Sequence, residues 1–153
     1  MSNGTKVKKR DGRIESLDLD KMHLMVEEAC QGLAGVSASQ VEMKSGIQFY
    51  DGITTSEIQE ILIRSASDLI DLDNPNYQYV AARLLLFALR KQLYGKMREL
   101  PHLEAHILSC TEIDVYDKEI FVKYSKEEID KANSFIDHSR DFKFTYAGLR
   151  QVV

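Results

Sequence analysis

An apolar run at residues 80–89, interrupted by a single charged residue, Arg83, is the feature that most constrains the fold of this chain. The run lies within a stretch of helical spacing from 76 to 94, and its apolar side chains occupy nearly every side of that helix. Because such a helix needs cover on all sides, we expect it to be the central helix of a bundle. Arg90 and Lys91 suit the negative end of the helix dipole, and Gly95 suits the end of the helix.

Length and composition set the outer bounds. With 153 residues, of which 44% are hydrophobic and 29% charged, the chain fits one soluble domain, or one domain and part of a second. Its net charge of −4 argues against a general nucleic-acid-binding protein, because such proteins are usually basic. The sequence shows no apolar run of membrane-spanning length and no secretory signal, so we expect no membrane partner and a cytoplasmic location.

A basic hairpin near the N-terminus is the second strong feature. Residues 5–17 predict two short polar strands, and Asp11 with Gly12 forms a typical two-residue hairpin turn. The consecutive cations of segment 8–10 suit one half of a phosphate-binding site. The alternative is a solvated edge strand, whose lysines prevent pairing with other chains.

Several further helices are expected around the central one. With the central helix at 76–94 included, the four main helices cover about 21–31, 39–47, 54–70 and 76–94. Shorter helices follow over 100–110 and from 125 onwards. The second helix has two possible capping boxes, Ser37 with Gln40 or Ser39 with Glu42. The hairpin and four helices together predict an α+β fold that is mainly helical.

The starts of the first and third helices carry polar residues that matter for binding. Asp18 or Asp20 can cap the first helix, and the segment 54–57 supplies caps and a capping-box glutamate for the third. Backbone N–H groups at a helix N-terminus bind anions, and threonine hydroxyls such as that of Thr55 add donors. The third helix is therefore a candidate for the second half of a phosphate-binding site, which Lys9 would complete from the hairpin.

Other site chemistries receive little support. The sequence contains neither the P-loop pattern nor the Rossmann glycine pattern. His102 and His106 have the spacing of metal ligands on a helix, but a surface helix face accounts for them as well, and we predict no metal site. Cys30 and Cys110 lie far apart without a CxxC pattern, which favours free thiols in a reducing compartment.

A set of motifs then extends over nearly the whole chain. These motifs lie at 7–12, 15–21, 37–42, 47–55, 76–84, 90–95, 124–128 and 135–141. In combination they resemble the ATP-cone domain, and more closely the N-terminal part of the large (alpha) subunit of class I (Ia-type) ribonucleoside-diphosphate reductases from bacteria or their phages. The resemblance implies a four-helix bundle capped by a three-stranded sheet over residues 5–95. Residues 96–153 would then be the start of the helical part of the catalytic α/β-barrel domain.

The resemblance also implies a function. The ATP-cone of these enzymes binds ATP or dATP, with Mg²⁺, as an overall activity switch: ATP keeps the reductase active, and dATP favours an inhibited assembly of large and small subunits. The parent enzyme is an oxidoreductase that makes deoxyribonucleoside diphosphates for DNA synthesis. Its catalytic residues lie in the barrel beyond this chain, so we expect no catalytic residue and no reductase activity here. The expected partners are ATP or dATP, the small radical-generating subunit and other large subunits.

Carried over residue by residue, the resemblance implies a nucleotide site. Lys9 and Lys91 would hold the phosphates beside Thr55, while Glu15, Asp18 and Lys21 would contact the base and sugar. The full set of expected nucleotide-binding residues is Lys9, Arg10, Glu15, Ser16, Leu17, Asp18, Leu19, Asp20, Lys21, Met22, Thr55, Gln59 and Lys91. Val7, Leu17 and Met22 would contact the ring.

Three positions depart from the pattern of related sequences. Asp18 stands where related sequences often have Asn, Glu57 where close relatives have Asp, and Gln59 where they have His. An ionised aspartate only accepts hydrogen bonds, whereas asparagine also donates them. These departures bear on the discrimination between ATP and dATP.

Two alternatives remain open. One is a transcriptional regulator with an ATP-cone and no reductase activity, but such regulators also carry a zinc ribbon of four cysteines, and this chain has two. The other is a helical protein-interaction module that binds no nucleotide. For an allosteric module, the segment 37–47 is a candidate contact with the partner subunit.

Overall fold

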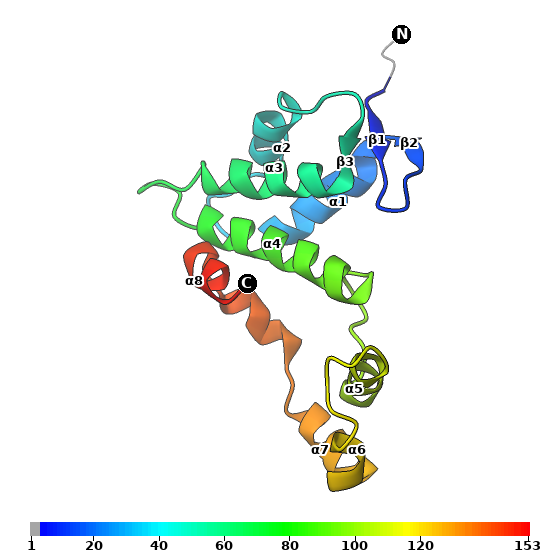
Figure 1. Cartoon of the computed structure of the whole chain (residues 1–153). Coiled ribbons are helices and arrows are strands. Elements are labelled where there is room, and N and C mark those ends of the chain that lie inside the picture. The colour runs from blue at the N-terminus through cyan, green and yellow to red at the C-terminus, as the bar shows by residue number, and fades with distance from the viewer. Residues whose placement is uncertain (1–3) are drawn as a thin grey trace. The chain divides into compact units, whose positions relative to one another are not determined.

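The computed structural model describes residues 4–153 as a mainly helical chain with one small sheet (Figure 1). In chain order the elements are β1 (Lys6–Lys8), β2 (Ile14–Ser16), α1 (Leu19–Cys30), α2 (Ala38–Gly46), β3 (Ile53–Thr54), α3 (Thr55–Ser67), α4 (Tyr77–Tyr94), α5 (Leu103–Glu112), α6 (Ile120–Lys123), α7 (Lys126–Ser134), the 3₁₀ helix η1 (His138–Lys143) and α8 (Tyr146–Val152). The predicted α+β, mainly helical fold class is confirmed. Within residues 4–153, no helix combines the length and apolarity needed to cross a bilayer.

The described chain divides into two compact units, and each is considered by itself. The first contains the chain up to Leu89 together with Phe142–Val153, and the second contains Arg90–Asp141. α4 therefore begins in the first unit and ends in the second. The boundary expected from the sequence near residue 95 stays a prediction.

The sheet has the strand order β2-β1-β3, with β1 in the middle. β1 and β2 pair antiparallel as a hairpin, whereas β1 and β3 pair in parallel (Figure 1). The predicted two-residue turn at Asp11 and Gly12 is wrong: the Lys9 N–H donates to the Arg13 carbonyl at 2.8 Å, so the loop comprises residues 10–12. Gly12 adopts a φ of +86° in the hairpin turn, a conformation that glycine reaches without steric cost. The sheet thus joins the N-terminal hairpin to the start of α3.

α4 supplies much of the core of the first unit, as its apolar sequence predicts. Val80 and Ala81 are fully buried, and the side chain of Phe87 is 1% exposed. The remaining buried apolar residues of its central stretch are Ala82, Leu84, Leu85 and Leu86. α2 packs against both α1 and α3. The apolar run is therefore covered, which confirms that it is a core helix.

The first helix begins earlier than the sequence indicated. α1 starts at Leu19 because Asp18 is its cap: the Asp18 carboxylate accepts the backbone N–H of Lys21 at 2.9 Å. At its other end, the Arg83 guanidinium of α4 donates to the carbonyls of Ala29 (3.2 Å) and Gln31 (2.7 Å). This cation binds carbonyls that a helix C-terminus leaves without intrahelical partners.

The second helix differs from expectation at its start. α2 begins at Ala38 with Ser37 as its cap, but the Ser37 side chain makes no capping hydrogen bond. Tyr77 of α4 takes the place of the expected capping box, because its hydroxyl accepts the Ser37 N–H and donates to the Gln40 side chain. The predicted box of Ser37 with Gln40 is therefore wrong.

The third helix has the predicted cap and a shorter C-terminal end. α3 ends at Ser67 rather than near Ile70, because the N–H groups that follow Asp68 bond back three residues instead of four. Leu69 donates to the carbonyl of Ala66 and Ile70 to that of Ser67, both at 3.2 Å. Such tighter bonding commonly ends a helix.

The C-terminal residues return to the first unit. Phe142 packs edge-to-face against Phe87 of α4 with ring centroids 6.2 Å apart, and the Arg83 guanidinium lies 5.3 Å from the Phe142 ring centroid. Arg150 of α8 pairs with Glu60 of α3 at 3.2 Å. α8 is therefore linked to the helix that follows β3.

The second unit contains α5, α6 and α7. α5 and α7 pack together, and Asn133 of α7 accepts the N–H of Leu103 at the start of α5. Ser125 and Glu128 form a complete capping box, which confirms the predicted helix start at this point. Arg90 is buried and pairs with Asp141 at 2.8 Å, which ties the two ends of the unit together.

Candidate anion-binding site

The sheet register places the basic strand beside the start of α3. In the parallel pair, Val7 lies opposite Ile53 and Lys8 opposite Thr54. Thr55, the first residue of α3, and Lys9 each follow directly on these paired strands. Two segments that are distant in the sequence thus meet at a helix N-terminus, where anions bind favourably.

Contacts of Lys6 hold this junction in place. Its backbone N–H donates to the Asp51 carboxylate at 2.7 Å, and its carbonyl accepts the N–H of Gly52 at 2.9 Å. Gly52 has a φ of +88°, a left-handed conformation that favours glycine. The turn at 51–52 therefore delivers β3 to β1 in register.

A complete capping box begins α3. The Thr54 hydroxyl accepts the N–H of Glu57 at 3.2 Å, and the Glu57 carboxylate accepts the Thr54 N–H at 2.9 Å and the Thr54 hydroxyl at 2.7 Å. The Tyr50 hydroxyl also donates to Glu57, at 2.8 Å. These bonds, those of Thr54 above all, lower the pKa of Glu57. The hydrogen bond between Tyr50 and Glu57 also raises the pKa of Tyr50.

The hairpin charges interact with one another. The Lys9 ammonium lies 3.4 Å from one carboxylate oxygen of Glu15, and the other oxygen lies 3.4 Å from the Arg13 guanidinium. Arg13 also binds the Asp11 carboxylate at 2.7 Å. The hydrogen bond from the Arg13 backbone N–H, followed by this side-chain contact, lowers the pKa of Asp11, and the side-chain contact raises the pKa of Arg13.

The start of α1 follows directly on β2. The Leu17 N–H donates to the carbonyl of Thr5 at 2.8 Å, so the strand pairing continues to the Asp18 cap. The Ser16 hydroxyl accepts a bond from the Lys6 ammonium at 3.2 Å. All of the expected site residues in this stretch are exposed or half-buried; they are Ser16, Leu17, Asp18, Leu19, Asp20, Lys21 and Met22.

The remaining expected site residues lie in other positions. Gln59 is half-buried in the second turn of α3, and Arg10 is exposed in the hairpin turn. Lys91 lies in the last turn of α4, within the second unit, and its part in a site stays a prediction. Val7 is 2% exposed, so it belongs to the core beneath the sheet.

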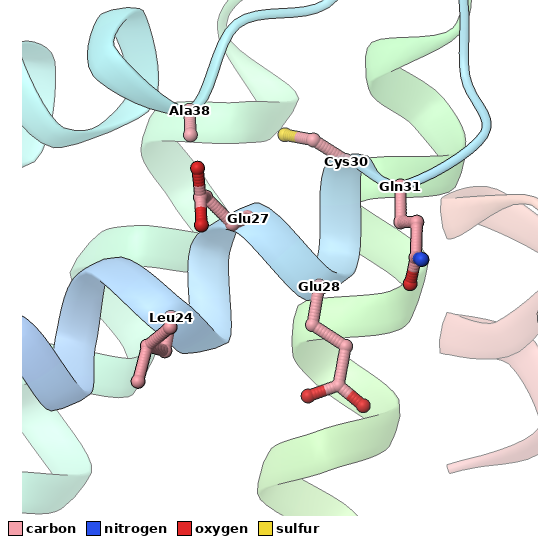
Figure 2. Close-up of a pocket in the computed structure, with 6 residues that line it drawn as sticks. All are labelled: Leu24, Glu27, Glu28, Cys30, Gln31 and Ala38. Atoms are coloured by element: carbon pink, nitrogen blue, oxygen red, sulfur yellow. The ribbon is translucent and has the colours of Figure 1, made fainter.

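An open hollow of about 470 Å³ lies elsewhere, along the C-terminal half of α1 and the start of α2 (Figure 2). Its lining residues are Leu24, Glu27, Glu28, Cys30, Gln31 and Ala38. Figure 2 shows the Glu27 carboxylate directed toward Ala38, whereas Glu28 extends to another side of the helix. None of the nucleotide-binding residues expected from the sequence lines this hollow. Burial raises the pKa of the Cys30 thiol to about 11, so the thiol is protonated at neutral pH.

The two histidines with metal-ligand spacing have separate structural roles. His102 caps α5, with Nδ1 accepting the Glu104 N–H at 3.2 Å and Nε2 lying 3.5 Å from Asp130. His102, Glu104 and Asp130 come close enough to surround a cation. However, the cap bond leaves the neutral imidazole's proton on Nε2, so a metal there would require losing the cap. His106 instead packs between the rings of Tyr94 and Tyr116.

The sequence reasoning missed two residues that shape the junction. Tyr50 and Asp51 lie in an irregular segment where no periodicity marks a role, yet Tyr50 binds Glu57 and Asp51 binds Lys6. Among residues 4–153, the arrangement at the junction presents a basic strand, threonine hydroxyls and a helix N-terminus. This combination suits a polyphosphate.

Comparisons with known proteins agree with this chemistry. The model of the ATP cone domain family matches residues 5–92. The chain is 47% identical over 152 residues to ribonucleoside-diphosphate reductase 1 subunit alpha of Escherichia coli (strain K12), covering 99% of this chain and 20% of that protein. It is 46% identical over 152 residues to the alpha subunit of Haemophilus influenzae, with coverage of 99% and 20%.

A phage protein shows the same likeness. The alpha subunit of Enterobacteria phage T4 is 40% identical over 146 residues, which cover 94% of this chain and 19% of that protein. The chain thus spans about one fifth of the length of these relatives, which are ribonucleoside-diphosphate reductase alpha subunits. Since the family model matches more than half of its residues, this chain belongs to the ATP cone domain family.

Proposed function

We propose that this chain is the allosteric ATP/dATP-binding module of a ribonucleoside-diphosphate reductase alpha subunit. The observation that carries the proposal is the parallel β1–β3 pairing, in which Lys8 lies opposite Thr54. This pairing brings Lys9 beside the first turn of α3, where a helix dipole and N–H groups attract phosphate. The family match over residues 5–92 supports a nucleotide as the ligand.

Each side of the junction has its own part in the proposal. Lys9 and Thr55 bind the phosphates with their Mg²⁺, and Lys91 joins them according to the family resemblance. Glu15, in the second strand of the hairpin, and Asp18 and Lys21, at the start of α1, contact the sugar and base. A carboxylate accepts hydrogen bonds from hydroxyl groups, so this side is the one that can respond to the 2′-hydroxyl that ATP has and dATP lacks.

Regulation then requires a difference between the two complexes. ATP and dATP differ by one hydroxyl, so only differential contacts to that group, or the pose it permits, can shift an equilibrium. In the parent enzyme, ATP maintains activity and dATP favours an inhibited assembly with the small subunit. This module carries the signal, and the reduction of ribonucleoside diphosphates occurs elsewhere in the parent protein.

Calorimetric titration with Mg·ATP and Mg·dATP tests the proposal directly. We expect saturable binding of both nucleotides to the wild-type chain, and weaker binding to the Lys9→Ala and Lys9→Ala/Lys91→Ala variants. Lys8→Ala is the matched control, because it removes the same charge from the same strand but lies on the opposite sheet face. Absence of heat and of a thermal shift with either nucleotide at millimolar concentration would contradict the proposal and favour a helical interaction module.

A further inference from the structure

The strongest observation beyond the proposed site is that its phosphate-binding lysine already has a partner. The Lys9 ammonium lies 3.4 Å from Glu15, and the Lys9 side chain is about a third exposed. Any polyphosphate that binds Lys9 at this position therefore meets a carboxylate of the same sign of charge as itself.

The sheet register builds this contact. Glu15 lies directly opposite Val7 in the antiparallel pair. Lys9 directly follows β1 and lies two residues beyond Val7, and its N–H still pairs across the hairpin, so its side chain lies on the same face as that of Val7. Diagonal neighbours on one face of an antiparallel pair are within reach of long side chains. The hydrogen bond from the Lys9 N–H to the Arg13 carbonyl, at 2.8 Å, keeps the two strands in this register up to the turn.

The neighbouring charges leave Glu15 as the internal partner of Lys9. Asp11 is held by Arg13 through both its backbone and its side chain. The Lys6 ammonium lies on the other face, where it donates to Ser16. Glu15 itself is shared between Lys9 and Arg13, so it keeps one cationic partner when Lys9 turns away.

We propose that Glu15 is an internal competitor that nucleotide phosphate must displace from Lys9, and that its displacement releases the carboxylate to bind the sugar. This inference rests on the proposed function. Phosphate and carboxylate compete for one ammonium, because both bind it by charge-assisted hydrogen bonds. Once released, a Glu15 oxygen can accept a hydrogen bond from a ribose hydroxyl. The site thereby reads the phosphate chain first and the sugar second, and it disfavours nucleosides that lack phosphates.

Sodium tripolyphosphate separates the two parts of this mechanism because it has phosphates and no sugar. Its affinity is measured by calorimetry, in direct titration and in competition with ATP. We expect tripolyphosphate to bind Glu15→Gln about two- to fivefold more tightly than wild type, the range that an exposed ion pair allows. The gain for ATP should be smaller, because the variant also loses its carboxylate contact with the sugar.

Two controls isolate the Lys9–Glu15 pair. Glu112→Gln changes the net charge equally but lies at the end of α5, so it should leave tripolyphosphate affinity unchanged. In a Lys9→Ala background, Glu15→Gln should give no gain in tripolyphosphate affinity, because the ammonium for which the carboxylate and the phosphate compete is absent. Both hairpin positions are exposed or half-buried, so the thermal unfolding midpoints of the variants should stay close to that of wild type.

The outcomes distinguish this inference from the proposed function. If wild type binds ATP but Glu15→Gln binds tripolyphosphate no more tightly, Glu15 is not a competitor and the inference is overturned. The same holds if tripolyphosphate fails to compete with ATP in both proteins, or if the gain persists without Lys9. Failure of wild type to bind ATP at all would instead overturn the proposed function.

Discussion

The hydroxyl group of Tyr77 in α4 accepts a hydrogen bond from the backbone N–H of Ser37, the residue that precedes α2, at 3.0 Å. The same hydroxyl donates to Gln40 at 2.8 Å, and the Tyr77 side chain is 2% exposed. Tyr77 of the central helix thus binds the two groups, the Ser37 N–H and the Gln40 side chain, that a local capping box would have engaged. The side chain of Asn76, the residue before α4, donates to the carbonyl of Ala34 at 2.9 Å, so two adjacent residues at the start of α4 hold the α1–α2 connection.

Removal of this hydroxyl should destabilise the fold. Tyr77→Phe leaves the Ser37 N–H and the Gln40 carbonyl without their buried partner, which costs about 1–3 kcal/mol of unfolding free energy. Urea denaturation followed by circular dichroism measures the loss. Tyr79→Phe, at a half-buried position of the same helix, is the control and should change stability by less than about 0.5 kcal/mol, because its hydroxyl is not the one that holds Ser37 and Gln40. Equal stabilities for the two variants would show that the hydroxyl is not a structural cap.

The α3 capping box should make stability depend on pH in the acid range. The bonds from Thr54 lower the pKa of Glu57 in the folded chain below its ordinary value of 4.5. A lowered folded pKa means that the stabilisation is present above pH 4.5 and is lost as the pH falls through the folded pKa. Thermal unfolding midpoints of wild type should therefore fall more steeply below pH 4.5 than those of Glu57→Gln. Parallel curves for the two proteins would argue against this role.

Thr54→Ala tests the other half of the box at neutral pH. Loss of a threonine N-cap typically costs about 1 kcal/mol, so we expect a loss of that size in urea denaturation. Thr54→Ser should retain most of the stability, because serine keeps the hydroxyl. A Ser variant as unstable as the Ala variant would assign the effect to the methyl group instead.

A histidine of α1 that pairs with a carboxylate of α2 should give the opposite dependence near neutral pH. His23 Nδ1 lies 2.7 Å from Glu42, and Nε2 lies 3.4 Å from Glu27. Glu42 above all, and then Glu27 and Asp20, raise the pKa of His23 above 6.5. A raised folded pKa gives stabilisation that is full below pH 6.5 and is lost as the pH rises through the folded value.

NMR titration of the His23 ring measures this pKa directly. Glu42→Gln should lower it more than Glu27→Gln does, because Glu42 makes the shorter contact. His23→Gln should flatten the change in stability between about pH 6 and 8. A His23 pKa below 6.5 in the wild-type chain would be incompatible with the ion pairs described here.

Asp18 offers a way to separate helix capping from nucleotide discrimination. Asn and Asp are about equally good N-caps, so Asp18→Asn should preserve stability, whereas Asp18→Ala should cost about 1 kcal/mol. Asn can donate as well as accept, so the Asn variant should change the ratio of ATP to dATP affinity measured by calorimetry. An unchanged ratio in the stable Asn variant would place the discrimination at another residue.

The sequence predicted helix starts well wherever the cap is local. Thr54 with Glu57 forms the expected box, and Ser125 with Glu128 forms one at the expected helix start, because in each case both partners lie within one turn. The Ser37 box does not form, because the hydroxyl of Tyr77, which is distant in the sequence, binds both the Ser37 N–H and the Gln40 side chain. No local pattern carries information of that kind.

The candidate site was only half visible in the sequence for a similar reason. The basic hairpin is a local feature, and so is the threonine-rich start of α3. Their meeting depends on β3, a strand of two residues whose pairing leaves no periodic signal. Family resemblance supplied the connection that residue patterns lacked, and the register of Val7 with Ile53 now gives it a geometric basis within the described chain.

The parallel pairing of β1 with β3 also has a consequence for folding. Lys8 and Thr54 can pair only after the intervening hairpin, α1 and α2 have closed a long loop, and that closure costs chain entropy. A peptide containing the hairpin alone cannot form the junction. A ligand that binds across the junction would therefore stabilise the closed loop. Bound ligand would make dissociation of β1 from β3 rarer and would protect β1 from amide hydrogen exchange and proteolysis.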